Sequence, residues 1–480
     1  MLKTLGAQIK EFKKDSFLTP VFMILEVLME TVIPLMMASI IDNGVEKGDI
    51  HHIYVMGGLM IVTACVSLFA GVMGGKYGAR ASTGFARNLR KAMYENIQTF
   101  SFSNIDKFST AGLVTRLTTD VTNIQMAYQM ILRMCVRAPI TLVCAMIMAF
   151  FINAKLACIY LAAVILLGII LAFITVRAHK YFTQVFPKYD DLNASVQENV
   201  SAIRVVKAYV REDFEKDRFK KASENIYRIF VKAERNVIFN APLMMTTVYT
   251  CILLISWLGA KMIVGSTLTT GDLMSLLAYC MNILMSLMML SMVFVMITMS
   301  MASAKRISEV LNETSDLKNP EHPFMKVEDG SIEFRHVDFA YKKDSDEPVL
   351  EDIDLKIRSG ETIGIIGGTG SGKSTLVSLI PRFYDPQEGT VKVNGINAKD
   401  YPQGELCSEI GVVQQRSILF KGSIRDNLKW GNDQASDEDL WKAITIAQAK
   451  DVVEAKPGKL DSEVEQNGRN LSGGQKQRLT

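Results

Sequence analysis

The sequence lacks the compositional features of several protein classes. Only 12 of its 480 residues are proline and 49% are hydrophobic, which excludes both a disordered and a collagen-like chain. Lys and Arg together number 53 and Asp and Glu 50, so the net charge is only +3. Such a balance provides no overall basic surface for a polyphosphate backbone, and we expect no nucleic-acid partner.

Cysteine is scarce as well. There are seven cysteines, an odd number, and no two of them form a C-x-x-C pair. Six lie in or beside apolar runs and Cys407 stands alone; the six are Cys65, Cys135, Cys144, Cys158, Cys251 and Cys280. We therefore expect small hydrophobic side chains rather than a disulfide framework or a metal site.

No cleavable signal peptide is evident at the N-terminus. Leu2, Leu5, Ile9 and Phe12 recur at helical spacing, and the lysines of this segment lie largely elsewhere on the helix. This pattern predicts an interfacial elbow helix over residues 1–15, lying on the cytoplasmic leaflet of a membrane.

What the sequence has in abundance is long apolar stretches. Its mean hydropathy is +0.18, a high value for so long a chain. A bilayer is crossed by about 20 apolar residues in a helix. Six stretches of this length predict an α-helical six-span transmembrane domain over residues 16–311, with spans at Phe17–Ile41, Ile53–Gly74, Ile131–Ile152, Leu156–Val176, Leu243–Val264 and Leu273–Met301.

The links between these spans alternate in length. Short links follow the first, third and fifth spans, whereas the links Lys76–Met130 and Arg177–Pro242 are long and polar. As out-and-back helical pairs, they would reach about 40 Å from the membrane at ~1.5 Å per residue. Lys and Arg concentrate in the long links and at the N-terminus, which predicts that these parts lie in the cytoplasm of a multi-pass cell-membrane protein.

Two features inside the spans are open to more than one interpretation. Glu26 and Glu30 share one helix face, and a carboxylate in hydrocarbon is costly, so neither should face lipid. They line a substrate cavity or carry a proton, or else they form an ordinary polar contact between helices, which is the commoner case. The sixth span carries many methionines, which suit ligands of varied shape but also simply fill membrane helices: Met274, Met281, Met285, Met288, Met289, Met292, Met296 and Met299.

The composition changes after Leu311. Residues 312–326 are polar and predict a linker, and residues 327–480 predict a soluble α/β domain that is incomplete at its C-terminus. There, an apolar strand predicted at Thr362–Ile366 leads into a glycine-rich loop, which a helical run at Leu376–Ile380 follows. The loop reads Gly367, Gly368, Thr369, Gly370, Ser371, Gly372, Lys373, Ser374, Thr375, which is G-x-x-x-x-G-K-[ST] between a strand and a helix.

This loop predicts a site for nucleotide phosphates. Its glycines allow successive backbone N–H groups to surround an anion at a helix N-terminus. Lys373 would place its charge at the β- and γ-phosphates, and the Ser374 hydroxyl would coordinate Mg²⁺. The cofactors expected from these residues are ATP and Mg²⁺.

A second glycine-rich helix start, near the end of the chain, reduces the range of nucleotide-binding proteins that fit the sequence. It reads Leu471, Ser472, Gly473, Gly474, Gln475, followed by Lys476 to Leu479. Two glycines after a serine form another anion site, one that lacks a lysine of its own. A nucleotide site built from this segment and a P-loop would need two such domains facing each other.

These motifs resemble half-transporters of the ATP-binding cassette (ABC) exporter family, of the multidrug and lipid exporter type. The resemblance covers nearly the whole chain and implies a type I exporter fold followed by a P-loop nucleotide-binding domain. It implies that residues 367–375 are the Walker A loop and residues 471–475 the signature motif. It further implies that Gln415 contacts Mg²⁺ and that Tyr341 stacks on adenine.

The long links also resemble those of the family. Residues 108–121 are similar to the first cytoplasmic link, and Glu198-Asn199 with Ile203–Ala208 to the second. The resemblance implies coupling helices near Asn104–Thr110 and Arg211–Phe219.

The chain departs from the family pattern in two places. The Walker B strand, its acidic residues and the switch histidine that would follow Thr480 are not in this sequence, and all five histidines precede the P-loop. Without a general base we expect no efficient hydrolysis by this chain and regard the sequence as truncated. Residues 464–468 read V-E-Q-N-G, which resembles one partner of a heterodimeric exporter more than a homodimer subunit.

The predicted function is ATP-driven export of a small amphipathic molecule, drug or lipid by alternating access. The expected partners are a second half-transporter, membrane lipid and a small-molecule substrate. Two alternatives are import of a siderophore-like substrate by the same fold, and an ATP-binding fragment that does not hydrolyse ATP. A peptide-processing exporter is disfavoured because no protease-like segment precedes the first span.

Overall fold

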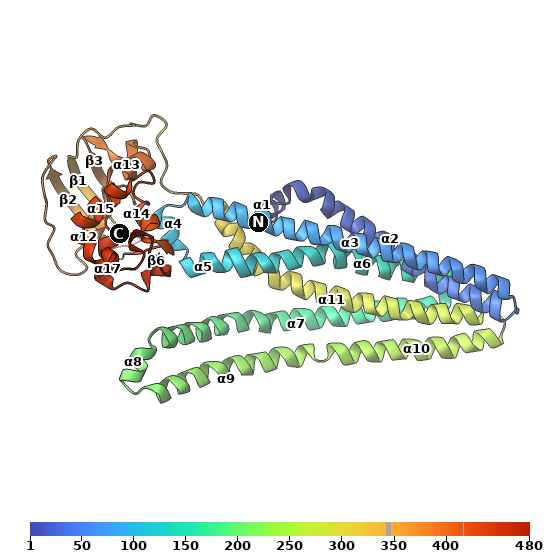
Figure 1. Ribbon diagram of the computed structural model, residues 1–480. Helices are drawn as coiled ribbons and strands as arrows, with labels where there is room; N and C mark the ends of the chain where they lie inside the picture. Colours follow the sequence, from blue (N-terminus) through green and yellow to red (C-terminus); the bar gives the residue numbers. More distant parts are fainter. Residues whose placement is uncertain (342–346, 416) are drawn as a thin grey trace. The chain divides into compact units, whose positions relative to one another are not determined.

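A computed structural model describes residues 1–341, 347–415 and 417–480 of the protein. These residues form two compact units, one of residues 1–100 and 104–314 and the other of residues 101–103 and 315–480 (Figure 1). The first unit is helical, and the second contains the strands.

The first unit confirms the six predicted spans. In the described residues, six helical segments are long and apolar enough to cross a membrane, and each contains or nearly contains one predicted stretch. The helices that form them are α2 (Lys13–Ser39), α3 (Ile50–Gln98), α6 (Val121–Ile152), α7 (Ala154–Ser201), α10 (Asn240–Val264) and α11 (Thr270–Asn312). α2 continues through one π-helical segment (Ile40–Val45), and another (Arg116–Asp120) precedes α6.

The N-terminal segment differs from the single helix that we predicted. It consists of α1 (Leu2–Ala7) and one 3₁₀ turn (Lys10–Phe12), interrupted at Lys10, whose φ is 41°. Leu5 is buried with Phe85 of α3, and the Phe12 ring occupies the space beside Gly84. Part of the apolar face of this segment is therefore covered by protein, which fixes the bend at the entry to α2.

The long links are helical, as predicted. α3 continues past its apolar stretch to Gln98, and short helices α4 (Phe102–Lys107) and α5 (Thr110–Thr115) lead back toward α6. In the second link, α7 and α9 (Glu212–Val237) lie side by side and α8 (Ile203–Ala208) joins their ends (Figure 1).

Buried polar groups tie the spans together. The Tyr279 hydroxyl of α11 donates to the Thr31 carbonyl of α2 at 2.7 Å, and the Tyr160 hydroxyl of α7 donates to the Leu276 carbonyl at 2.7 Å. Both tyrosines are fully buried, so an unmade bond at either position would cost the desolvation of the hydroxyl. The two bonds fix the register of α11 against its neighbours.

The described residues of the second unit form two larger cores and a smaller cluster of Val393, Ala398, Tyr401 and Leu406. One larger core lies on an antiparallel sheet of order β2-β1-β3-β4, with strands β1 (Ile332–Phe339), β2 (Leu350–Ile357), β3 (Glu388–Val393) and β4 (Ile396–Asn397). Leu379 of α12 (Lys373–Leu379) belongs to the same buried cluster as Phe334 of β1. The other core is formed by α14 (Ile424–Leu428), α15 (Asp437–Ile446), α16 (Lys450–Glu454) and α17 (Gly473–Leu479), beside the strand pair β5 (Gly422–Ser423) and β6 (Glu463–Val464); α13 (Gln403–Glu409) lies between them in sequence.

One predicted strand is not observed. Thr362–Ile366, directly before the P-loop, forms no strand, and Ile366 is 98% exposed. A strand needs a hydrogen-bonded neighbour, and among the described residues none pairs with this segment. The apolar composition of this segment is typical of a buried strand, but the prediction was wrong; a strand also depends on the segments with which it can pair.

Candidate functional site

The glycine-rich loop has the backbone conformation that its sequence requires. Gly370 and Gly372 have φ values of 87° and 80°, in the left-handed region that glycine tolerates best. A Cβ on Gly372 would lie 2.7 Å from Cδ2 of Leu350 and 3.0 Å from the Val349 carbonyl oxygen. The loop can therefore turn into α12 only with glycine at this position.

Lys373 lies against the loop that precedes it. Its Nζ donates to the carbonyls of Gly367 at 2.9 Å and Gly368 at 2.6 Å, and contacts the Ser371 hydroxyl at 3.3 Å. No side chain caps the start of α12, and the neighbouring Ser374 is exposed. A phosphate entering here would meet an ammonium group and uncapped N–H groups, the two features that bind anions at a helix start.

Tyr341 is joined to the P-loop helix. Its hydroxyl lies 3.0 Å from that of Thr375, and half of the residue remains exposed. Gln415 is exposed at a bend, and no hydrogen bond joins it to Ser374 among the described residues. The structure thus brings Tyr341 to the P-loop helix, whereas the pairing of Ser374 and Gln415 around Mg²⁺ stays a prediction.

The signature segment begins α17 with a capping box. The Ser472 hydroxyl accepts from the Gln475 backbone N–H at 3.3 Å, and the Gln475 side-chain oxygen accepts from the Ser472 N–H at 3.0 Å. Leu471 is buried in the core below, with Leu479. Gly473 and Gly474 have open space where a side chain would lie, so this helix start presents bare backbone to its surroundings.

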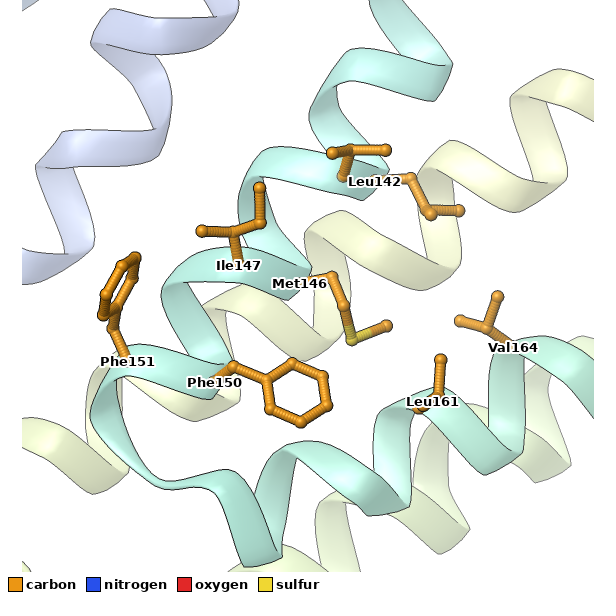
Figure 2. Close-up of a pocket in the computed structure, with 8 residues that line it drawn as sticks. Leu142, Met146, Ile147, Phe150, Phe151, Leu161 and Val164 are labelled. Carbon is orange, nitrogen blue, oxygen red and sulfur yellow. The ribbon is translucent and has the colours of Figure 1, made fainter.

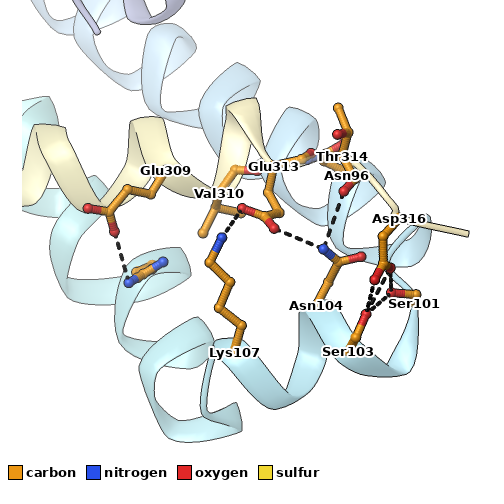
Figure 3. Close-up of polar contacts among 11 residues, drawn as sticks. Asn96, Ser101, Ser103, Asn104, Lys107, Glu309, Val310, Glu313, Thr314 and Asp316 are labelled. Carbon is orange, nitrogen blue, oxygen red and sulfur yellow. Dashed lines mark hydrogen bonds and ion pairs between the residues drawn. The ribbon is translucent and has the colours of Figure 1, made fainter. Parts of the chain in front are cut away.

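Of the two predicted coupling helices, the first has a short helix near its predicted position and the second does not. Asn104–Thr110 covers most of α4 and the first residue of α5, where Asn104 and Lys107 bind the Glu313 carboxylate at 2.9 and 2.7 Å (Figure 3). In the second link the separate short helix is α8, and Arg211–Phe219 instead begins the long helix α9. The second prediction was therefore wrong in position, because α9 continues its helical pattern without a break from Glu212.

Glu26 and Glu30 share a partner that we did not predict from the sequence. The Arg137 guanidinium of α6 donates to Glu26 at 2.5 Å and to both oxygens of Glu30 at 2.8 and 3.0 Å. The second oxygen of Glu26 is buried without a partner, while the side chain of Glu30 is 39% exposed. A charged residue inside the predicted span Ile131–Ile152 was the signal available for Arg137.

A separate pocket lies between the end of α6 and the start of α7 (Figure 2). Its volume is about 570 Å³ and every lining side chain is apolar; the residues are Leu142, Val143, Met146, Ile147, Phe150, Phe151, Leu161 and Val164. With no polar group to orient a ligand, it suits an acyl chain or another apolar group. Neither Glu26 nor Glu30 lines it.

The methionines of the sixth span are unevenly placed on α11. Every exposed residue from 274 to 292 is methionine, at the spacing of one helix face; they are Met274, Met281, Met285, Met288 and Met292. The exposed faces of other spans carry different side chains, such as Ile61 and Leu68 on α3 or Leu253 on α10. We call these five residues the methionine face.

One cluster outside these sites could hold a cation by its ligand types. His336, Asp352 and Asp354 offer ligand atoms within 4.8 Å of one another and all three are exposed. The His336 ring binds Asp352 at 2.7 Å, and this bond with the nearby Asp354 charge raises the pKa of the histidine. The three groups satisfy one another and have no second feature that indicates a metal.

Comparisons with known proteins agree with this architecture. Residues 16–288 match the family model of the ABC transporter transmembrane region, and residues 350–480 match the ABC transporter family model. The chain is 35% identical over 460 residues to the ABC transporter ATP-binding protein YfiB of Bacillus subtilis, covering 96% of this chain and 80% of the relative.

Two further relatives cover the whole chain. One is the ABC transporter ATP-binding protein Rv1273c of Mycobacterium tuberculosis, 34% identical over 484 residues and 83% of its length. Another is the ATP-dependent lipid A-core flippase of Desulfotalea psychrophila, 28% identical over 488 residues and 84% of its length. Both alignments span the membrane unit and the nucleotide unit together.

Proposed function

The chain belongs to the ABC transporter family, and from this premise we propose that it is one half of an ATP-driven exporter of small amphipathic molecules. The protein is a multi-pass membrane protein with its ATP-binding domain in the cytoplasm. The observation that carries the proposal is the P-loop. It combines left-handed glycines, an uncapped helix start and the ammonium group of Lys373 in a chain that also has six spans.

The residues of the P-loop divide the work of holding ATP and Mg²⁺. Lys373 would exchange its loop carbonyls for phosphate oxygens, and the exposed Ser374 hydroxyl would bind Mg²⁺ together with Gln415. Tyr341 would stack on the base. Bound ATP supplies the free energy of phosphoryl transfer; the chain supplies binding and positioning.

An amphipathic substrate fits the membrane unit. Relatives 28% and 26% identical to this chain are named lipid A-core flippases, which supports an amphipathic lipid or drug as cargo. The methionine face offers flexible, polarizable thioethers to an apolar body, and the partly exposed Glu30 could contact a polar group. In this proposal Glu26 mainly holds Arg137 in place between α2 and α6.

The proposed transporter has two halves. The signature segment has open glycines but no lysine positioned as Lys373 is, so it would complete an ATP site on the P-loop of a second subunit. We propose a heterodimer, because V-E-Q-N-G at residues 464–468 resembles one partner of such exporters. Closure of the two cassettes would then drive inward-to-outward switching of the spans.

Transport into inverted membrane vesicles tests this function. The natural gene product and its partner subunit would be expressed together, and uptake of a lipophilic fluorescent dye and of a fluorescently labelled phospholipid would be followed with ATP present. We expect uptake by the wild type and by the control Lys450→Ala, which removes an exposed lysine of the same unit. Lys373→Ala should abolish uptake of both probes.

Vesicle orientation decides the direction. Export predicts ATP-dependent accumulation in inverted vesicles and none in right-side-out vesicles loaded with ATP. Accumulation with the opposite orientation would contradict export, and uptake that survives Lys373→Ala would contradict the role of the P-loop.

A further inference from the structure

Three aromatic rings of the nucleotide unit, those of Phe339, Tyr341 and Tyr384, contact one another. Tyr341 meets Phe339 at a ring distance of 5.1 Å and Tyr384 at 5.3 Å, with interplanar angles of 83° and 89°. Phe339 and Tyr384 are 5.5 Å apart, so the three rings form a closed triangle. Neither neighbour stacks flat on Tyr341, and half of that residue remains exposed.

The far end of Tyr341 is held by a different element. Its hydroxyl lies 3.0 Å from the Thr375 hydroxyl, which α12 buries to 4% exposure. Thr375 directly follows Lys373 and Ser374, the residues proposed to bind phosphate and Mg²⁺. One hydrogen bond thus joins the aromatic triangle to the phosphate end of the site.

Tyr384 is itself on a well-fixed segment. Arg382, two residues before Tyr384, is 3% exposed and adopts a left-handed φ of 57°. Its guanidinium binds Asp385 at 2.9 Å and donates to the carbonyls of Lys318 at 3.0 Å and Lys399 at 3.1 Å. These bonds hold the turn that carries Tyr384, whose ring meets that of Tyr341 edge-on.

We propose that Tyr384 and Thr375 are positioning residues that hold the Tyr341 ring ready to stack on the base of a nucleoside triphosphate, an inference that rests on the proposed ATP site. A lone tyrosine at the end of a strand would lose rotational freedom each time a base stacked on it. A ring fixed beforehand by an edge-on neighbour and a hydroxyl bond avoids that loss, which strengthens binding.

The proposal separates recognition of the base from recognition of the phosphates. Because stacking of a base on an aromatic ring contributes to affinity, we expect Tyr341→Ala to bind ATP roughly tenfold more weakly. Loss of the Tyr384 ring in Tyr384→Ala should weaken ATP by about two- to tenfold. Tyr341→Phe removes only the hydroxyl bond to Thr375 and should have an effect of similar size, about two- to tenfold.

Binding of two probes to the purified full chain in lipid nanodiscs tests this inference. The probes are Mg-ATP, which has a base, and inorganic tripolyphosphate, which has none. We expect Tyr384→Ala to weaken Mg-ATP and leave tripolyphosphate within about twofold of the wild type, because only the base meets Tyr341. Tyr384→Phe keeps the ring and should restore Mg-ATP binding. Phe324→Ala removes a half-exposed ring elsewhere in the same unit and should change neither probe.

A double variant makes the test specific to positioning. In a Tyr341→Ala background, Tyr384→Ala should have no further effect on Mg-ATP, because the ring that it supports is gone. An equal loss of both probes in Tyr384→Ala, or an undiminished effect in that background, would overturn the inference while leaving the ATP site intact. A wild-type chain that binds neither probe, or binds both regardless of Lys373→Ala, would contradict the proposed function as well.

Discussion

The two glycine-bearing helix starts of the nucleotide unit are built in opposite ways. At α12 the preceding residue is Gly372 in a left-handed conformation, no side chain caps the helix, and Lys373 bends back over the loop. At α17 the Ser472 and Gln475 side chains satisfy each other's backbone N–H groups, and the lysine of this segment, Lys476, is the fourth residue of the helix. Both segments are rich in glycine, yet only the first leaves its helix start uncapped.

This difference shows what each segment can do without a partner. The P-loop supplies charge and backbone donors from one chain, so we expect it to bind a polyphosphate without a partner. The signature helix is already capped and offers a smooth glycine surface, which suits close contact with a ligand held mainly by another subunit. Three pairs of variants test the contrast.

The largest difference in stability is expected between alanine substitutions at the two glycines. Gly372→Ala forces a side chain into a left-handed conformation and against Leu350, which should lower the free energy of unfolding by about 2–5 kcal/mol. Gly474→Ala meets nothing within 4 Å and should change stability by less than about 1 kcal/mol. Thermal unfolding of the two variants in nanodiscs measures this, and equal shifts would remove the steric basis of the comparison.

The two serine substitutions should differ in their effect on the Mg²⁺ dependence of ATP binding. Ser374→Ala removes the proposed Mg²⁺ ligand, so we expect ATP affinity to fall by about tenfold with Mg²⁺ and to change little with a chelator present. The corresponding Ser472→Ala should keep the Mg²⁺ dependence of the wild type. Calorimetric titrations with and without Mg²⁺ decide this; a Mg²⁺ dependence that persists in Ser374→Ala would show that the metal is held elsewhere.

The smallest effect concerns the cap of α17. Ser472→Ala deletes the hydroxyl that accepts the Gln475 N–H and should destabilise the unit by about 1 kcal/mol. Ser472→Asp keeps an acceptor at the cap and serves as the matched control, with little change expected. If both variants unfold at the wild-type temperature, the capping box contributes nothing measurable to the fold.

The sequence predicted local features of the site well and long-range ones poorly. The P-loop pattern located the start of a helix, and α12 indeed begins within it at Lys373. The six spans also followed from composition, because apolar length is a local property. The strand predicted at Thr362–Ile366 failed because its composition says nothing about which segment pairs with it.

The missed contacts have the same cause. Arg137 lies more than 100 residues from Glu26 and Glu30, and only the packing of α2 on α6 brings them together. Tyr341 and Thr375 are 34 residues apart and meet through the fold of the nucleotide unit. In each case the residue types indicated a function, but the packing of distant elements determined which residue became the hydrogen-bond partner.

Titration of Mg-ATP into the purified chain and two variants tests most directly whether the P-loop holds the nucleotide. We expect one ATP per chain for the wild type and for Ser472→Ala, with similar affinities, and no measurable binding for Lys373→Ala. Binding that survives Lys373→Ala, or that is lost only in Ser472→Ala, would contradict the assignment of the ATP site to the P-loop.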